Sequence, residues 1–339
     1  MNHILVTGGA GFIGSNFVRY MLKKYPRLKI TNLDVLTYAG NLANLKDIES
    51  DPRYRFVQGN ICDEKKVAEA MDGCDAVVNF AAETHVDRSI HEGGIFVETD
   101  VKGVFVLCEE ARRRKVKRFL HISTDEVYGS RLKGFFKESA RLTPSSPYSA
   151  AKAGGELLAR SYYVTYKLPV LVTRSSNNYG PYQYPEKLIP LFITNLIENK
   201  SVPVYGDGKQ VRDWLFVEDQ CEALDIVLHK GRVGNIYNVG SHNEEFNIDV
   251  TKGILRLLGK GEDLITYVKD RPGHDRRYAV DITKIQKLGW EKRHNFLQGL
   301  EKTVAWYKAN EEWWRDIKQK QADYKAWMEK HYKPLEKAK

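Results

Sequence analysis

Gly8-Gly9-Ala10-Gly11-Phe12-Ile13-Gly14 lies between an apolar stretch at residues 2–7, which predicts a buried strand, and a helical pattern over residues 12–22. Its glycines fit the spacing G-x-x-G-x-x-G of a dinucleotide-binding loop. Gly8 permits a tight turn, Gly11 lets backbone approach a pyrophosphate, and Gly14 lets the helix pack on the strand. Asp34 follows the next predicted strand, residues 29–33, about 20 residues after the loop. An acid there accepts a hydrogen bond from a ribose 2′-hydroxyl and repels a 2′-phosphate, so the sequence predicts NAD rather than NADP.

Strand and helix patterns alternate from this loop through the first half of the chain. Further strands are predicted at residues 54–58, 76–80, 118–122 and 170–173, and helices at residues 64–71, 96–114 and 148–166. This order predicts an α/β fold, a Rossmann-like doubly wound parallel sheet with helices on both faces. Ligands of such sheets bind outside the carboxyl ends of the strands. Asn60-Ile61, residues 81–85 and residues 123–126 should therefore line one crevice.

The pattern changes after Thr173. Residues 175–190 are rich in Asn, Tyr, Pro and Gly, and residues 203–208 resemble a turn. A helical pattern at 217–229 and a short strand at 235–239 are predicted to return to the sheet. We predict an NAD-binding Rossmann-like domain over 1–174, with 213–240 returning to it. A smaller α/β substrate-binding lobe is predicted over 175–212 and 241–325, followed by a basic tail, 326–339, for which a solvated helix is the default.

Bulk properties narrow the class of protein. The chain has 339 residues and a net charge of +9. No apolar run approaches the roughly 20 residues that cross a membrane, and the first residues lack a signal-peptide layout. The cysteines, Cys62, Cys74, Cys108 and Cys221, lack the spacing of metal ligands or of a disulfide framework. We expect a cytoplasmic protein with no metal, no membrane contact and, because no nucleic-acid motif accompanies the charge, no nucleic-acid partner.

Ser123-Thr124-Asp125-Glu126-Val127-Tyr128-Gly129 places two adjacent acids at the end of a predicted buried strand. Acids there are costly unless they are hydrogen-bonded or used in chemistry. Tyr148-x-x-x-Lys152 follows at the start of a helical pattern, so that phenol and ammonium lie on one face. A solvated loop for the acids and a core role for Tyr148 are the plain alternatives. Beside the glycine loop, we interpret these residues as oxidation and acid–base machinery, without deciding which acid donates and which accepts.

These motifs resemble the extended short-chain dehydrogenase/reductase superfamily and, more narrowly, the dTDP-glucose 4,6-dehydratase family. The narrower resemblance covers nearly all of residues 3–290 and is carried by residues 81–89, 123–129, 177–183, 185–187, 204–208, 212–214 and 270–277. Three residues depart from the family pattern. Asn60 stands where Asp is usual, Thr84 where Ser is commoner, and Ser175 where Cys is common.

The resemblance implies a reaction in three steps on dTDP-glucose. Oxidation at C4 makes the C5 hydrogen acidic, water then leaves from C5 and C6, and C6 is reduced to give the 4-keto-6-deoxy sugar. Tyr148 is the expected base, with its pKa lowered by Lys152 and a cationic nicotinamide, and Thr124 is expected to hydrogen-bond the C4 oxygen. By resemblance Glu126 is the base at C5 and Asp125 the acid at C6, which requires their pKa values to be split.

The predicted binding residues fall into two sets. The cofactor set is Gly8, Gly11, Phe12, Ile13, Gly14, Asp34, Thr37, Asn60, Ile61, Ala81, Ala82, Thr84, Thr99, Tyr148, Lys152 and Asn178. The substrate set, carried mainly by the resemblance, is Thr84, His85, Thr124, Asn177, Glu186, Lys187, Leu188, Pro203, Tyr205, Arg212, Asn247, Arg271 and His274. Lys187 and Arg212 are expected to neutralise the pyrophosphate. For His85, a buried structural role and a contact to sugar or nicotinamide are equally compatible with the sequence.

Other readings share part of this pattern. A sugar-nucleotide 4-epimerase would use the loop, Tyr148 and Lys152 but needs no Asp125-Glu126 pair. A UDP- or GDP-sugar 4,6-dehydratase differs in the base pocket, and an NAD-sensing binding protein would not need the four reactive side chains. The resemblance also implies a homodimer formed by the helices at 96–114 and 148–166, although their apolar faces could equally belong to the core.

Overall fold

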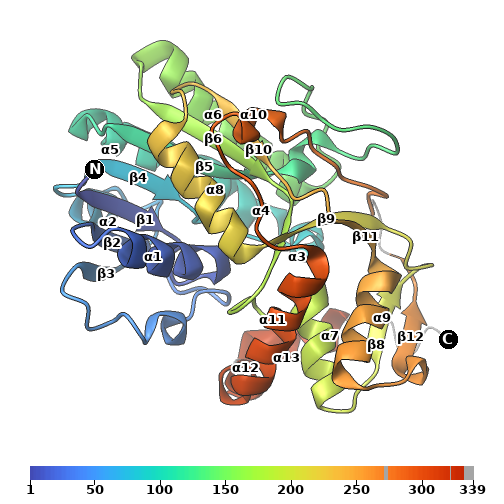
Figure 1. The fold of residues 1–339 in the computed structure, drawn as a ribbon. Coiled ribbons are helices and arrows are strands. Elements are labelled where there is room, and N and C mark those ends of the chain that lie inside the picture. Colours follow the sequence, from blue (N-terminus) through green and yellow to red (C-terminus); the bar gives the residue numbers. More distant parts are fainter. Residues whose placement is uncertain (271–273, 321, 332–339) are drawn as a thin grey trace.

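The computed structural model describes residues 1–270, 274–320 and 322–331. Its centre is a parallel sheet with the strand order β10-β6-β5-β4-β1-β2-β3 (Figure 1). The strands are β1 (His3–Thr7), β2 (Lys29–Asp34), β3 (Tyr54–Gln58), β4 (Ala76–Asn79), β5 (Arg118–Thr124), β6 (Val170–Ser175) and β10 (Ile236–Val239). The order reverses at β1, between β2 and β4, which opens a crevice at the carboxyl ends. The predicted doubly wound fold is confirmed, including the return of the chain through β10.

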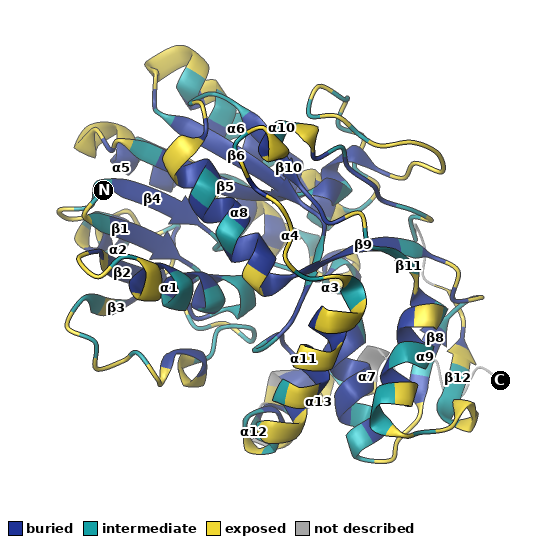
Figure 2. Ribbon diagram, viewed as in Figure 1, coloured by how far each residue is buried: buried dark blue, intermediate teal, exposed yellow. Residues whose placement is uncertain are grey.

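Helices cover both faces of this sheet because its strands are apolar on both sides. One face carries α1 (Phe12–Lys24), α8 (Val217–Lys230) and α10 (Thr283–Gln286). The other carries α2 (Glu64–Ala70), α5 (Val104–Arg114) and α6 (Pro147–Tyr166). Burial is concentrated on the strands and on the helix sides that face them, whereas the outer sides are exposed (Figure 2). None of the helices in the described ranges is long and apolar enough to cross a membrane.

The helix predicted at residues 96–114 is interrupted. It consists of α4 (Gly93–Val97), a π-helical turn (Glu98–Gly103) and α5, with the short α3 (Val86–His91) before it. The turn lies against α6 at Gly155, where an added Cβ would stand 2.0 Å from the carbonyl oxygen of Asp100. The π-helical turn therefore brings its backbone into contact with the backbone of α6. Hydrophobic periodicity in the sequence does not predict such a contact. Such π-turns are frequent at functional sites.

A smaller lobe follows β6 and lies beside the strand carboxyl ends (Figure 1). It contains β7 (Asn177–Tyr179), β9 (Val211–Phe216) and β11 (Glu244–Phe246) in one sheet, and β8 (Val202–Tyr205) with β12 (Ile265–Val268) in another. Its helices are α7 (Leu188–Ile197), α9 (Asn247–Leu258) and α11 (Phe296–Ala309). They share a core of their own, with Tyr179, Phe192 and Trp214 among its buried aromatic residues. The exact division into domains stays a prediction.

The C-terminal helices are packed against the rest of the chain, and the default expectation of a solvated helix for the tail is wrong at Trp327, which is buried. α12 (Glu311–Lys320) and α13 (Ala322–His331) bury Trp314, Ile317, Tyr324 and Trp327. Trp313 donates from Nε1 to Asn44 of the cofactor side, at 2.9 Å. Tyr324 packs against Tyr184 of the lobe. The lysines of this segment made it look solvent-exposed in the sequence, although a few of its apolar side chains are buried. Residues 332–339 lie outside the described part.

Candidate active site

All sixteen residues predicted to hold the cofactor line one cleft, which runs along the carboxyl ends of the central strands. The glycine loop forms its floor because side chains would block it. A Cβ at Gly8, whose φ is +69°, would stand 2.6 Å from the amide nitrogen of Ala81, and one at Gly14 would stand 2.3 Å from the carbonyl oxygen of Gly8. α1 begins after Gly11 with no side-chain cap, so its first amides face the cleft available for phosphate oxygens. This cradle fits a dinucleotide pyrophosphate.

Asp34 ends β2 beside the glycine loop, as predicted. Its carboxylate accepts backbone hydrogen bonds from Ala10 and Leu36, both at 2.9 Å. Burial raises the pKa of Asp34, while these two amides oppose the rise. Each carboxylate oxygen keeps a second lone pair, so the anchored acid can also accept from a ribose hydroxyl in the cleft. The geometry fits NAD.

The five predicted catalytic residues all line the same cleft. β5 ends at Thr124, whose hydroxyl accepts from the amide of Glu126 at 3.2 Å and caps the 3₁₀ turn Asp125–Tyr128. Tyr148 and Lys152 lie in the first turns of α6. A capping box at Ser146 and a proline at the first position fix where that helix starts. The phenol of Tyr148 shares a hydrogen bond with the Thr124 hydroxyl.

Burial and neighbouring charges shape the protonation of this cluster. Burial, then the adjacent Glu126, raises the pKa of Asp125 well above its usual value and so favours the protonated carboxyl. Burial also raises the pKa of Tyr148, and the charges of Glu126 and Asp100 add to that rise. The expected lowering of the Tyr148 pKa by Lys152 together with a cationic nicotinamide stays a prediction. Lys152 donates to the carbonyl oxygen of Ile122, at 2.8 Å.

Two further acids belong to this neighbourhood: Glu83, within the stretch 81–85 predicted to line the crevice, and Asp100, which sequence reasoning missed. Asp100, in the π-turn, is 1% exposed and its Oδ1 lies 3.8 Å from Nζ of Lys152. Burial raises the pKa of Asp100 to about 7, and burial raises that of Glu83 to about 7 as well. A signal for Asp100 existed. It interrupts an apolar helical stripe that includes Phe96 and Val104, where an acid is expected only with a partner.

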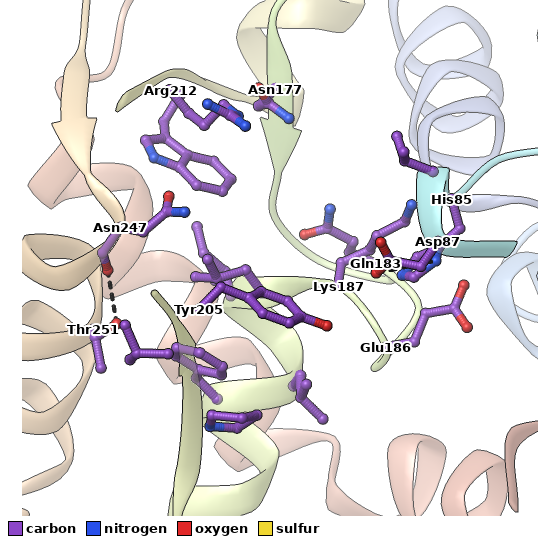
Figure 3. A pocket seen from close by; sticks show the side chains of 18 of the residues that line it. His85, Asp87, Asn177, Gln183, Glu186, Lys187, Tyr205, Arg212, Asn247 and Thr251 are labelled. Carbon is purple, nitrogen blue, oxygen red and sulfur yellow. Dashed lines mark hydrogen bonds and ion pairs between the residues drawn. The ribbon is translucent and has the colours of Figure 1, made fainter. Parts of the chain in front are cut away.

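A second cleft, lined by the smaller lobe, adjoins the first (Figure 3). His85, Glu126, Asn177, Asn178 and Lys187 line both clefts. The predicted substrate residues that line the second cleft are His85, Asn177, Glu186, Lys187, Leu188, Pro203, Tyr205, Arg212, Asn247 and His274. Thr84 and Thr124 line the first cleft instead, and Arg271 lies outside the described residues. Sequence reasoning missed Asp87, Gln183, Trp214 and Thr251, which also line the second cleft.

Two charged side chains of the second cleft, Arg212 and Lys187, are held by hydrogen bonds. Arg212 donates to the carbonyl oxygens of Val211 and Asp275, at 2.8 and 3.0 Å, and its guanidinium lies 4.6 Å from the ring centre of Tyr278. Lys187 donates to the Thr84 hydroxyl at 3.4 Å. Both cations line the second cleft.

Glu186 and His85 occupy the edge between the two clefts. The carboxylate of Glu186 is paired with Arg88 at 2.9 Å, so it positions that arginine as well as lining the cleft. His85 adopts a φ of +95° and is buried against the edge of Trp327, with ring centres 5.5 Å apart. Burial lowers the pKa of His85 to about 4, so its imidazole is neutral at pH 7. The structure thus makes His85 both a packed residue and a cleft residue.

Buried amide groups provide a test of whether the clefts suit a polar ligand. The side-chain oxygens of Asn177, Asn178, Gln183 and Asn247 are buried and lack a hydrogen-bond partner within the described chain. Buried acceptors without partners are rare, and they indicate groups that a bound molecule satisfies. All four residues line one or both clefts. Among the described residues no cluster of His, Cys, Asp and Glu has the geometry of a metal site.

Comparison with known proteins shows which family shares this sequence and fold. Residues 5–303 match the family described as GDP-mannose 4,6 dehydratase. The chain is 51% identical to the dTDP-glucose 4,6-dehydratase of Streptomyces niveus, over 93% of this chain and 95% of that protein. Among solved structures, DesIV of Streptomyces venezuelae, a dTDP-glucose 4,6-dehydratase with NAD and TYD bound, superposes with a TM-score of 0.91 at 49% identity. That match covers 93% of this chain and 99% of the other.

A UDP-glucose 4-epimerase of Thermotoga maritima is more distant. It superposes with a TM-score of 0.84 at 29% identity, over 91% of this chain and 99% of that one. The fold is thus shared with epimerases, whereas the higher identity is to the dehydratases. The chain belongs to the dTDP-glucose 4,6-dehydratase family, whose members are NAD-dependent hydro-lyases of the extended short-chain dehydrogenase/reductase superfamily.

Proposed function

We propose that this protein converts dTDP-glucose to dTDP-4-keto-6-deoxyglucose and water. The observation that carries the proposal is the position of Glu126. It lines both clefts, and it adjoins a buried Asp125 whose pKa is raised. A sugar that reaches from the second cleft toward the first would meet a base and a protonated acid side by side. That pair is the requirement for eliminating water after a C4 ketone has formed.

The first step needs a base at the C4 hydroxyl. NAD, when bound in the first cleft, would take the C4 hydride and later return it to C6. Tyr148 is the group that accepts the C4 hydroxyl proton, and Thr124, hydrogen-bonded to it, orients the same oxygen. The raised pKa of Tyr148 in the described structure means that its activation depends on added positive charge at the cleft. Lys152 supports this by holding the site rigid through Ile122.

In the second step the two acids take different roles because their surroundings differ. Glu126 removes the C5 proton, and Asp125 delivers its proton to the departing C6 hydroxyl. Asp125 is suited to the acid role because it is 2% exposed and because the negative charge of Glu126 disfavours its ionisation. Two carboxyls with separated pKa values can hold one proton between them in a defined place.

The diphosphate and base fit the second cleft. Arg212 and Lys187 supply positive charge, and Asn177 and Asn247 offer amide groups whose oxygens seek partners. Tyr205 and Pro203 of β8 provide flat apolar surface for the base. His274, which contacts Asp270 at 2.6 Å, lies at the same end. The roles of these residues remain proposals.

The alternatives are distinguished by particular groups. An epimerase has no use for the Asp125-Glu126 pair, of which Asp125 is buried in the first cleft and Glu126 lines both clefts. A GDP-mannose enzyme that relies on NADP is disfavoured by Asp34, whose carboxylate points into the cofactor cleft. A sensing protein without chemistry would not need Tyr148, Lys152 and both acids in one place.

The test is incubation of the purified protein with dTDP-glucose, without added cofactor, followed by mass analysis of the sugar nucleotide. Loss of one water without net NAD consumption is expected. Asp125→Asn should retain C4 oxidation, visible as reduced-cofactor absorbance, and lose elimination, whereas Tyr148→Phe should lose both. A product of unchanged mass with inverted C4 would instead establish an epimerase.

We also propose a state of association and a location in the cell for this protein. A homodimer is supported by apolar residues left exposed on the helices expected to pair, Phe105 on α5 with Leu157 and Val164 on α6. Sedimentation of the purified chain would decide its state of association. A cytoplasmic location is the setting in which the expected sugar-nucleotide substrate would be met, and fractionation of the source cells would test it.

A further inference from the structure

The proposed reaction leaves two side chains in the wrong protonation state, and the inference that follows rests on that function. Tyr148 gains the proton of the C4 hydroxyl. Asp125 loses a proton to the departing C6 hydroxyl, which leaves as water. Glu126 takes the C5 proton and returns it to C5, so it ends as it began. After one turnover Tyr148 holds one proton too many and Asp125 one too few.

The structure connects these two side chains through one hydroxyl. The phenol of Tyr148 is hydrogen-bonded to Thr124, and the Thr124 hydroxyl donates to Oδ1 of Asp125 at 3.3 Å. The amide of Glu126 donates to the same hydroxyl at 3.2 Å and holds it in place. Thr124 therefore accepts on one side and donates on the other, the arrangement that passes a proton along a chain of hydrogen bonds.

Asp125 has little other access to protons. It is 2% exposed, and its Oδ2 is buried without a hydrogen-bond partner in the described part of the chain. A bound sugar would close the cleft side further. The carboxyl that must be recharged is thus reached, within the protein, through the hydrogen bond from Thr124.

We propose that Thr124 returns the proton from Tyr148 to Asp125 at the end of each turnover. The O–H bond of Tyr148 breaks as a new O–H bond forms on Thr124, while the original Thr124 O–H bond breaks and one forms on Oδ1 of Asp125. Charge moves from the carboxylate to the phenolate, and no electrons leave the site. Thr124 thereby has two functions, orienting the C4 oxygen in the first step and resetting the acid after the last.

The test compares the first turnover with the steady state. Excess enzyme mixed with substrate reports the first turnover, and excess substrate reports kcat, in wild type, Thr124→Val and Thr124→Ser. Valine keeps the shape and removes the hydroxyl, whereas serine keeps a hydroxyl. We expect Thr124→Val to give a burst of about one product per site and then a kcat reduced by about 10²-fold, well beyond any loss in its first turnover. Thr124→Ser should restore most of kcat.

A second measurement needs no variant. In wild type, heavy water should slow steady-state turnover more than it slows the first turnover, because the reset moves protons between oxygen atoms. Equal losses in both regimes for Thr124→Val, or equal solvent isotope effects in wild type, would overturn the proposal. A wild-type enzyme that forms no dehydrated product at all would instead refute the proposed function, so the two failures are distinguishable.

Discussion

The ammonium of Lys152 lies 3.8 Å from Oδ1 of Asp100, and both side chains are buried. Lys152 comes from α6 and Asp100 from the π-turn. Glu83 also acts on the pKa of Asp100, and Glu156 on the pKa of Lys152. Burial lowers the pKa of Lys152, and Asp100 is the strongest influence opposing that fall. The charge next to the catalytic tyrosine is therefore set by an acid that does not contact the substrate.

Asp100→Asn should move the pH dependence of catalysis in a defined direction. The charge of Asp100 raises the pKa of Tyr148, so its removal lowers that pKa, and the rising limb of kcat/KM should shift to lower pH. Asparagine keeps the shape of the side chain, and melting temperature controls for a general loss of structure. A profile that stays in place or moves to higher pH would contradict this assignment.

Asp34→Asn and Asp34→Ser should weaken NAD binding and relieve the exclusion of NADP. Loss of a hydrogen bond to a charged group costs about 1.5–3 kcal/mol, so the Kd for NAD should rise at least about tenfold. Asparagine retains one oxygen for the amides of Ala10 and Leu36, and its effect should be the smaller. Calorimetric titration of the chain with each dinucleotide makes the comparison. Unchanged affinities would remove Asp34 from the cofactor site.

Gly155→Ala and Gly154→Ala form a matched pair on α6. Alanine favours a helix over glycine by about 1 kcal/mol at either position. At 155, however, the new Cβ would stand 2.0 Å from the carbonyl oxygen of Asp100, whereas at 154 it would stand 3.1 Å from a methyl group of Val101. We expect Gly155→Ala to lower the free energy of unfolding by about 2–3 kcal/mol and Gly154→Ala to change it by less than about 1 kcal/mol. Denaturant titration measures both, and equal effects would show that the π-turn yields freely.

Trp327→Ala should weaken substrate binding and lower stability. Trp327 is 7% exposed, lies edge-on to His85, and has the guanidinium of Arg88 4.6 Å from its ring centre. Removing it should cost about 3 kcal/mol of stability and raise KM more than it lowers kcat, because His85 lines both clefts and Arg88 holds the cleft residue Glu186, and neither serves as the proposed acid or base. Trp327→Phe, which keeps an aromatic edge, should be milder. A fall in kcat at constant KM would argue against this role.

Local sequence determined much of the fold and of the catalytic set. Glycine spacing, the position of Asp34 and the interval from Tyr148 to Lys152 each act within one strand–loop–helix unit, where backbone geometry dictates what neighbours what. The parallel sheet followed from the alternation of elements, since it leaves few other arrangements. For the same reason, the glycine loop, Asp34 and the residues at the strand ends could be assigned to the cleft before it was seen.

Tertiary structure decided the features that depend on contacts between distant segments. The partner of Lys152 is Asp100, and an acid within a helical pattern does not reveal which cation it will face. A solvated helix was the default expectation for the basic tail, yet Trp327 of this tail lies against His85, more than two hundred residues earlier in the chain. The sequence alone therefore determined which chemistry is present, through short-range geometry. Only the packed fold decided how that chemistry is charged, covered and connected, because burial and electrostatic coupling exist only once the segments have come together.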